Sequence, residues 1–239
     1  MKIELEKKPR NSILIEGFPG FGLVGTIATE FLIDHLKAKK IGRIVSDKIS
    51  PMVAVHDEKV IDPLGIFYDS KTNILILHAL IGINGLEWEL AEILNQLCKE
   101  IKVGEIISIE GIGSQAIMMP NATDASKSYF YSQNPKKWLS SGSLPLKEGI
   151  VMGVTGALLL NIKDVPLSCL FAETHTNLPD SRAAAKVIEV LDSYLGLKID
   201  YKPLLKKAEE FEEKLKTLLE KGKSASKLKE QKDELNYLG

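Results

Sequence analysis

The sequence predicts an α/β fold, built on a mostly parallel sheet that is flanked by helices and followed by a helical extension at the C-terminal end. Short β-branched runs that end abruptly at Gly, Asp or Asn alternate along the chain with amphipathic helical patterns. The predicted strands are apolar throughout, which is typical of parallel strands covered on both faces. The composition agrees: 44% of the 239 residues are apolar and 26% are charged, close to ordinary globular usage.

Strands are predicted where apolar runs are bounded by turn residues. They cover residues 12–16, 41–46, 52–57, 60–68, 73–79, 105–110 and 166–173. Helices are predicted where apolar residues recur every three or four positions. They cover residues 23–37, 87–99 and 181–195. Residues 111–146 are rich in Gly, Ser, Asn and Pro, and we expect loops with short strands there.

The last part of the chain differs from the rest, and we divide the chain into a globular domain (1–202), a helix (203–221) and a flexible tail (222–239). The helix carries apolar residues at alternating spacings of four and three, the pattern of a coiled-coil or bundle seam. These residues are Leu204, Ala208, Phe211, Leu215 and Leu218. The seam can pack on its own domain or between subunits of a homo-oligomer, and the sequence leaves both open.

Charge and hydropathy exclude several classes of protein. The formal net charge is -1 and the lysines form no extended basic patch, so no nucleic-acid partner is expected. The N-terminal residues alternate apolar with charged, and the longest apolar runs are far too short to span a bilayer, so we expect a cytoplasmic protein without a membrane partner. Cys98 and Cys169 lie in apolar segments and suit buried free thiols.

The segment Gly20–Gly25 (GFGLVG) has the spacing of a dinucleotide-binding loop between a strand and a helix. Pro19 removes a backbone amide where such a loop should turn, and Phe18 and Phe21 place two rings where a diphosphate would lie. We therefore expect a close-packed turn or a partner contact here, and no cofactor.

Three carboxylates end predicted strands: Glu16, Glu110 and Glu173, with His175 two residues after the last. Because open α/β sheets place their sites at strand ends, these residues could form a general acid/base cluster. They could equally cap neighbouring loop amides. The histidines show no metal-ligand spacing, so no metal is expected, and no residue is assigned a catalytic role.

Several segments in order along the chain resemble the proteasome assembly chaperone family in its archaeal form. They are Glu16–Gly25 (EGFPGFGLVG), Glu110–Gly113 (EGIG), Gly153–Leu159 (GVTGALL), Pro179–Ala185 (PDSRAAA) and the helical end near Pro203–Leu205. The resemblance implies a phosphorylase-like α/β fold adapted to protein binding without catalysis. It also implies a homo-oligomer that binds proteasome core particles or their subunits.

Some proteins related to this family dock through a C-terminal hydrophobic-Tyr-any motif. This chain ends in Tyr237, Leu238 and Gly239, so its tyrosine is third from the end and follows Asn236. We expect this tail to contact the partner, and the Phe18 and Phe21 loop to offer an exposed apolar contact. Two alternatives stay open: an enzyme of the same fold acting on a small nucleoside-like or phosphorylated ligand, and an oligomer whose tail only completes its own assembly.

Overall fold

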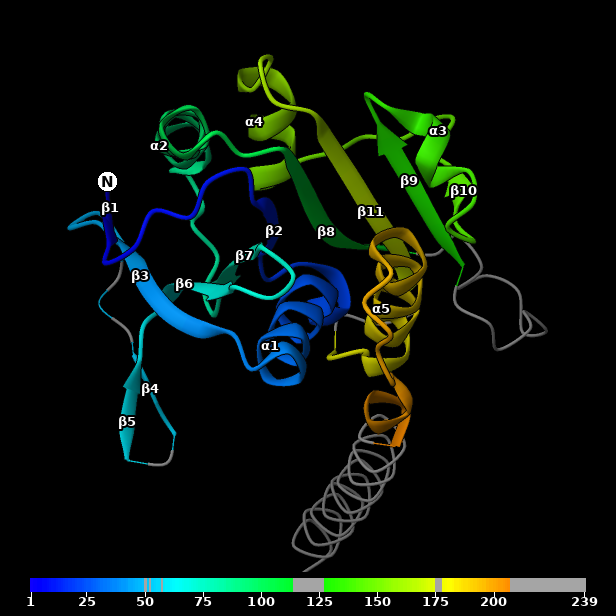
Figure 1. Cartoon of the computed structure of the whole chain (residues 1–239), viewed down its shortest axis with the longest axis horizontal. Coiled ribbons are helices and arrows are strands. Elements are labelled where there is room, and N and C mark those ends of the chain that lie inside the picture. Colours follow the sequence, from blue (N-terminus) through cyan, green and yellow to red (C-terminus); the bar gives the residue numbers. More distant parts are fainter. Residues whose placement is uncertain (50, 52, 57, 114–126, 175–177, 207–239) are drawn as a thin grey trace, which may run out of the picture.

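The computed structural model describes residues 1–206, apart from residues 50, 52, 57, 114–126 and 175–177. A nine-stranded sheet crosses this part of the chain in the order β1-β3-β6-β7-β2-β8-β11-β9-β10 (Figure 1). The strands are β1 (Lys2–Leu5), β2 (Ile13–Gly17), β3 (Lys39–Val45), β6 (Leu64–Asp69), β7 (Ile74–Ala79), β8 (Glu105–Gly113), β9 (Ser128–Ser132), β10 (Leu144–Pro145) and β11 (Leu167–Thr174).

The centre of the sheet is parallel and most of its flanks are antiparallel. Strands β7, β2, β8 and β11 run parallel, whereas β1, β3 and β6 pair antiparallel beside them. On the other side β9 is antiparallel to β11, and β10 is parallel to β9. A tight turn joins β6 to β7, and a connection that short can only link antiparallel strands. The predicted α/β class is confirmed, with a sheet that is parallel at its centre.

Two pairs of helices cover the two faces of the sheet (Figure 1). Helices α1 (Val24–Leu36) and α5 (Ser181–Leu195) pack on one face, and α2 (Glu87–Ile101) and α4 (Gly153–Asn161) on the other. Each pair closes an apolar layer against the central strands, so the core lies on both sides of the sheet. Further short helices are η1 (Phe21–Leu23) and α3 (Pro135–Trp138).

The predicted elements agree with these bounds, and the structure adds some that the sequence did not indicate. Helix α5 begins as expected after Asp180, whose side chain accepts a hydrogen bond from the amide of Ala183 at 2.9 Å. The predicted strands 52–57 and 60–68 correspond to β4 (Ala54–His56), β5 (Lys59–Ile61) and β6, and β4 and β5 form a hairpin that projects from the body (Figure 1). The N-terminal strand β1 was not predicted, because four residues of alternating apolar and charged character carry little signal.

The start of the predicted C-terminal helix is described at residues 202–206, which are helical. Leu204 is 4% exposed and packs with the layer of α1 and α5, so its burial requires no second subunit. Of the two packings that the sequence leaves open, Leu204 therefore shows the one on its own domain, and it needs no oligomer contact to be buried. The other four seam residues, Ala208, Phe211, Leu215 and Leu218, lie outside the described residues, and so does most of the division at 203–221 and 222–239. Among the helices of the described residues, none is long and apolar enough to cross a membrane.

Candidate protein-binding site

The predicted strand-end carboxylates Glu16, Glu110 and Glu173 and the turn that holds Phe18 and Phe21 lie at one edge of the sheet. The four parallel strands all end at this edge, which is where open α/β sheets bind their ligands. Helices α1, α2 and α5 each follow one of these strands, and α4 precedes β11, so all four helices begin at the same edge. We refer to it as the carboxyl edge.

The glycine-rich turn from β2 to α1 is packed backbone against backbone. A Cβ atom on Gly17 would lie 2.3 Å from the carbonyl oxygen of Gly25, and one on Gly25 would lie 2.6 Å from that of Ile109. On β8, a Cβ on Gly111 would lie 2.0 Å from the carbonyl oxygen of Phe21. Atoms cannot approach so closely, so these three positions require glycine for the turn to rest on β8. Close packing therefore explains the glycines at positions 17, 25 and 111.

The two aromatic side chains of the turn have different environments. Phe21 is 50% exposed, whereas Phe18 is 7% exposed and packs in the layer of α2 and α4. The expectation that Phe18 is exposed is therefore wrong, because Phe18 continues the inward face that Leu14 and Glu16 present in β2. Phe21 stays a candidate contact.

Other large apolar side chains are exposed at the carboxyl edge. Leu178 is exposed two residues before Asp180, whose amide donates to the carbonyl of Gly22 at 2.8 Å. Trp88 lies in the first turn of α2, and Ile150 and Met152 immediately precede α4. We call Phe21, Trp88, Ile150, Met152 and Leu178 the apolar rim. Large apolar side chains that stay exposed are candidates for contacts with a protein partner.

Beneath the rim, Glu16 and Glu110 are joined by two hydroxyl groups. The hydroxyls of Ser108 and Thr155 are 2.6 Å apart, and that of Thr155 donates to Oε1 of Glu110. Ser108 also hydrogen-bonds the carboxyl group of Glu16, whose Oε1 has no hydrogen-bond partner among the described residues. Each hydroxyl carries one proton. Every hydrogen bond in this network therefore has a donor when one glutamate is protonated and donates to the neighbouring hydroxyl.

The pKa values of both carboxyl groups are raised. Burial raises the pKa of Glu16 to about 8, and the nearby Glu110 adds to the effect while the Ser108 hydrogen bond opposes it. Burial raises the pKa of Glu110 to about 7, against the hydrogen bond from Thr155. Glu16 is 1% exposed. Because its pKa is the higher of the two, Glu16 is the last of the pair to lose its proton as the pH rises.

The third predicted carboxylate is separate from this network. The hydroxyl of Tyr129 donates to Glu173 Oε1 at 2.9 Å, and Glu173 is partly buried. His175 lies outside the described residues. The structure thus joins two of the three carboxylates.

Sequence reasoning missed Ser108, Thr155 and a buried histidine. Ser108 and Glu110 share a strand face through their spacing of two, which was available from the sequence. No sequence signal placed Thr155 beside them, because α4 is far from β8 along the chain. His78, opposite Gly17 in the β2–β7 register, lies 2.9 Å from the hydroxyl of Thr29, and burial lowers its pKa to about 4.

The predicted tail contacts Tyr237, Leu238 and Gly239 lie outside the described residues. The expected free thiols Cys98 and Cys169 are both buried and free. Cys169 pairs with Ser108 in the sheet register, and burial together with the carboxyls of Glu16 and Glu110 raises its pKa. A thiol of this kind is a packing residue at neutral pH.

Comparisons with known proteins cover nearly the whole chain. A model of the PAC2 family matches residues 14–219. PbaA of Pyrococcus furiosus, an archaeal homologue of proteasome-assembly chaperone, is 32% identical, with a TM-score of 0.83 over 98% of this chain and 99% of PbaA. MJ0106 of Methanocaldococcus jannaschii is 31% identical over 92% of this chain and 88% of its own length.

PbaB of Pyrococcus furiosus, an archaeal proteasome activator, shares the fold with a TM-score of 0.77 at 24% identity, over 91% of this chain and 98% of PbaB. The family match, the identity to MJ0106 and the likeness to PbaA agree along the chain. They confirm the family that the sequence indicated: the chain belongs to the PAC2 family.

Proposed function

We propose that this chain is a cytoplasmic, homo-oligomeric, chaperone-like protein without enzymatic activity that binds proteasome core particles or their subunits. The observation that carries the proposal is its similarity to PbaA, a homologue of proteasome-assembly chaperone, over 98% of this chain. The family as a whole supports the chaperone-like role.

The carboxyl edge supports protein binding in two ways. Backbone packing of the glycine turn brings Phe21 against β8, where its ring stays half exposed. Glu16 is almost completely buried, so a substrate at the surface cannot reach its carboxyl group. The edge therefore offers apolar side chains to a partner more readily than it offers charged groups to a small ligand.

The tail supplies the second contact in this proposal. Residues 222–239 join the helix through Gly222–Ser226, and Tyr237 lies close to the end of the sequence. Several such tails on one oligomer would raise the effective concentration of each and strengthen binding beyond that of a single tail.

The test is a binding assay against archaeal proteasome core particles with the full chain and with a chain that ends at Gly222. We expect the full chain to bind and the shortened chain to keep its oligomer mass while its affinity falls at least tenfold. If the shortened chain binds equally well, the tail does not dock. If it loses its oligomer, the tail completes self-assembly.

Phe21→Ala is expected to weaken binding to the core particle about tenfold, because a half-exposed aromatic anchor contributes about 1–2 kcal/mol to a protein interface. Thermal unfolding should change little, since the Phe21 ring is only half buried. Leu160→Ala is the matched control: Leu160 is 62% exposed and lies at the end of α4 away from the carboxyl edge. Equal affinities for the two variants would exclude Phe21 from the interface.

One observation favours a second candidate, an enzyme of the same fold acting on a small nucleoside-like or phosphorylated ligand. Glu110 is partly exposed, and its pKa of about 7 suits proton transfer near neutral pH. A small molecule that co-purifies with the protein and is released by Glu110→Gln would support it. Wild-type protein free of any such ligand that binds core particles would exclude it.

A further inference from the structure

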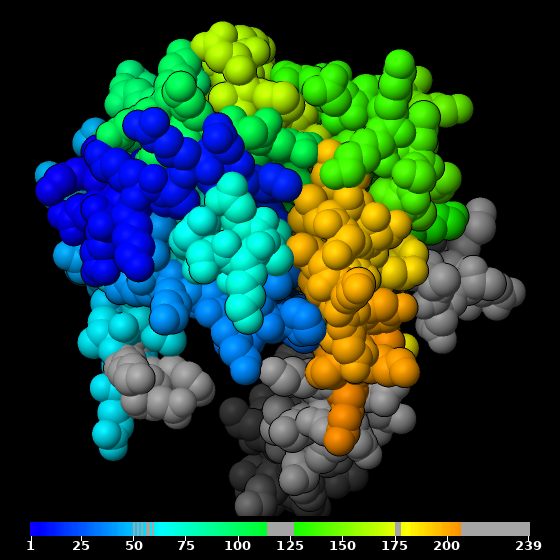
Figure 2. All heavy atoms as spheres, in the orientation of Figure 1, coloured from blue at the N-terminus to red at the C-terminus, as the bar shows by residue number. Residues whose placement is uncertain are grey.

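Among the described residues, no strand pairs with the outer side of β1, which leaves that edge of the sheet open. Strand β1 pairs with β3 and is the first strand in the sheet order. Figure 2 shows the N-terminal segment, in dark blue, at the outer surface of the molecule. An open edge carries unpaired backbone groups that can accept another strand.

The backbone groups that face this open edge can be identified. The amide of Glu6 donates to the carbonyl of Ile41, so this pair is hydrogen-bonded within the β1–β3 ladder. Hydrogen-bonded pairs alternate along antiparallel strands, so Glu4 and Lys2 also direct their backbone groups towards β3. Ile3 and Leu5 therefore direct their backbone amide and carbonyl groups outward, away from β3.

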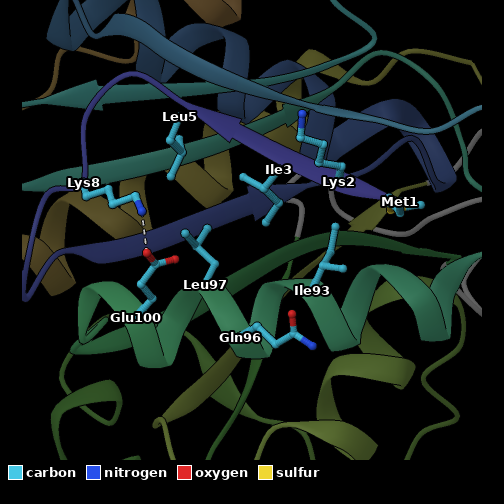
Figure 3. A pocket seen from close by; sticks show the side chains of 9 residues that line it. All are labelled: Met1, Lys2, Ile3, Leu5, Lys8, Ile93, Gln96, Leu97 and Glu100. Atoms are coloured by element: carbon cyan, nitrogen blue, oxygen red, sulfur yellow. Dashed lines mark hydrogen bonds and ion pairs between the residues drawn. The ribbon is translucent and has the colours of Figure 1, made fainter.

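A cavity of about 400 Å³ lies beside this edge, between β1 and α2. Figure 3 shows Ile3 and Leu5 of β1 pointing towards Ile93 and Leu97 of α2. An ion pair between Lys8 and Glu100 closes one end. An added strand would meet a mixed lining here, with apolar side chains of β1 and α2 beside the polar groups of Lys8, Gln96 and Glu100.

We propose that β1 pairs antiparallel with β1 of a second copy of this chain, centred on Ile3. The outward amide and carbonyl of Ile3 then exchange hydrogen bonds with those of the partner's Ile3. Leu5 lies opposite the partner's Met1, so the apolar side chains of both strands face the cavity beside α2. The two sheets become continuous across the pair.

Charge selects this register over its neighbours. With Ile3 opposite the partner's Ile3, Lys2 lies opposite the partner's Glu4, and the two opposite charges attract. Two neighbouring registers also allow the outward backbone groups of the two strands to hydrogen-bond. One places Glu4 opposite the partner's Glu4, and the other places Lys2 opposite the partner's Lys2. Both are like-charge pairs. The proposal rests on the proposed homo-oligomer and adds the surface that joins its copies.

Cysteine cross-linking tests the register. Ile3→Cys places two thiols directly opposite each other, at a Cα separation of about 5.5 Å that suits a disulfide. Mild oxidation should convert most of the protein to a covalent dimer, because the native cysteines are buried. Leu5→Cys is the matched control: its two copies would lie about 14 Å apart, too far to bond. Equal cross-linking of both variants, or of neither, overturns the proposal.

Charge exchange tests the pairing without cysteines. Lys2→Glu and Glu4→Lys should each raise the dissociation constant for self-association about tenfold in sedimentation, and the double exchange should restore it. A double variant as weak as either single one contradicts the register. Core-particle binding is measured on the same samples. If a variant loses self-association but still binds the core particle, this interface is independent of the proposed function. If the cross-linked dimer forms but does not bind the core particle, the proposed function is refuted and the interface stands.

Discussion

Gly17→Ala is expected to lower the free energy of unfolding by about 3 kcal/mol, because the added methyl group has no room at the carboxyl edge. The added Cβ would lie 2.3 Å from the carbonyl oxygen and 2.5 Å from the carbonyl carbon of Gly25. Both atoms are backbone in the first turn of α1, so no side-chain rotation relieves the overlap. The turn must move away from β8, and the Phe21 ring must move with it.

Chemical unfolding of Gly17→Ala beside Gly20→Ala measures this effect. Gly20 belongs to the same turn, is exposed, and a Cβ there meets no atom within 4 Å. The control should stay within about 0.5 kcal/mol of the wild type. Similar destabilisation by both substitutions would show that the turn needs glycine for flexibility and not for close packing.

Glu16→Gln is expected to remove most of a pH-dependent loss of stability. An ordinary glutamate has a pKa of 4.5, and burial raises that of Glu16 to about 8. Between these values the unfolded chain has released the proton and the folded chain still holds it. The free energy of unfolding of the wild type therefore falls as the pH rises from about 4.5 towards 8.

The size of this fall follows from the shift. Each unit of pKa corresponds to about 1.4 kcal/mol, so Glu16 alone accounts for a loss on the order of 4 kcal/mol by pH 8. Glutamine has a similar shape, can donate to Ser108 and has no proton to lose. The variant should match the wild type near pH 5 and exceed it in stability at pH 8.

Urea unfolding at several pH values between 5 and 9 provides the measurement. Glu30→Gln, which removes an exposed carboxylate from α1, should keep the wild-type dependence. A Glu16→Gln curve parallel to that of the wild type would show that Glu16 ionises normally in the folded protein. Glu110→Gln should remove a smaller part of the slope, because burial raises the pKa of Glu110 only to about 7.

Most of the fold was predictable because its central elements carry strong local patterns. The apolar run that forms β8 and the amphipathic run that forms α5 specify their structures without help from the rest of the chain. β1 and β9 instead depend on pairing with the distant strands β3 and β11, which hydrophobic periodicity does not encode. The burial of Leu204 likewise depends on the layer of α1 and α5 against which it packs.

The site was predictable only in part, for a related reason. The sequence indicated that Glu16 and Glu110 lie at one edge, because each ends a strand and parallel strands end at the same edge of the sheet. The hydroxyl of Thr155 that links the network comes from a helix 45 residues away from Glu110 along the chain. The exposure of Phe21 and the burial of Phe18 follow from the direction of each side chain in the turn, which the GFPGF sequence does not determine.

A native mass spectrum of the full chain mixed with archaeal proteasome core particles tests the central claim most directly, because it reports protein binding and ligand retention together. The account predicts a complex with the mass of the core particle plus the oligomer, and a free oligomer whose mass is a whole multiple of the 26.4 kDa chain. Core particles of unchanged mass beside an oligomer that carries a small nucleoside-like or phosphorylated molecule would contradict it.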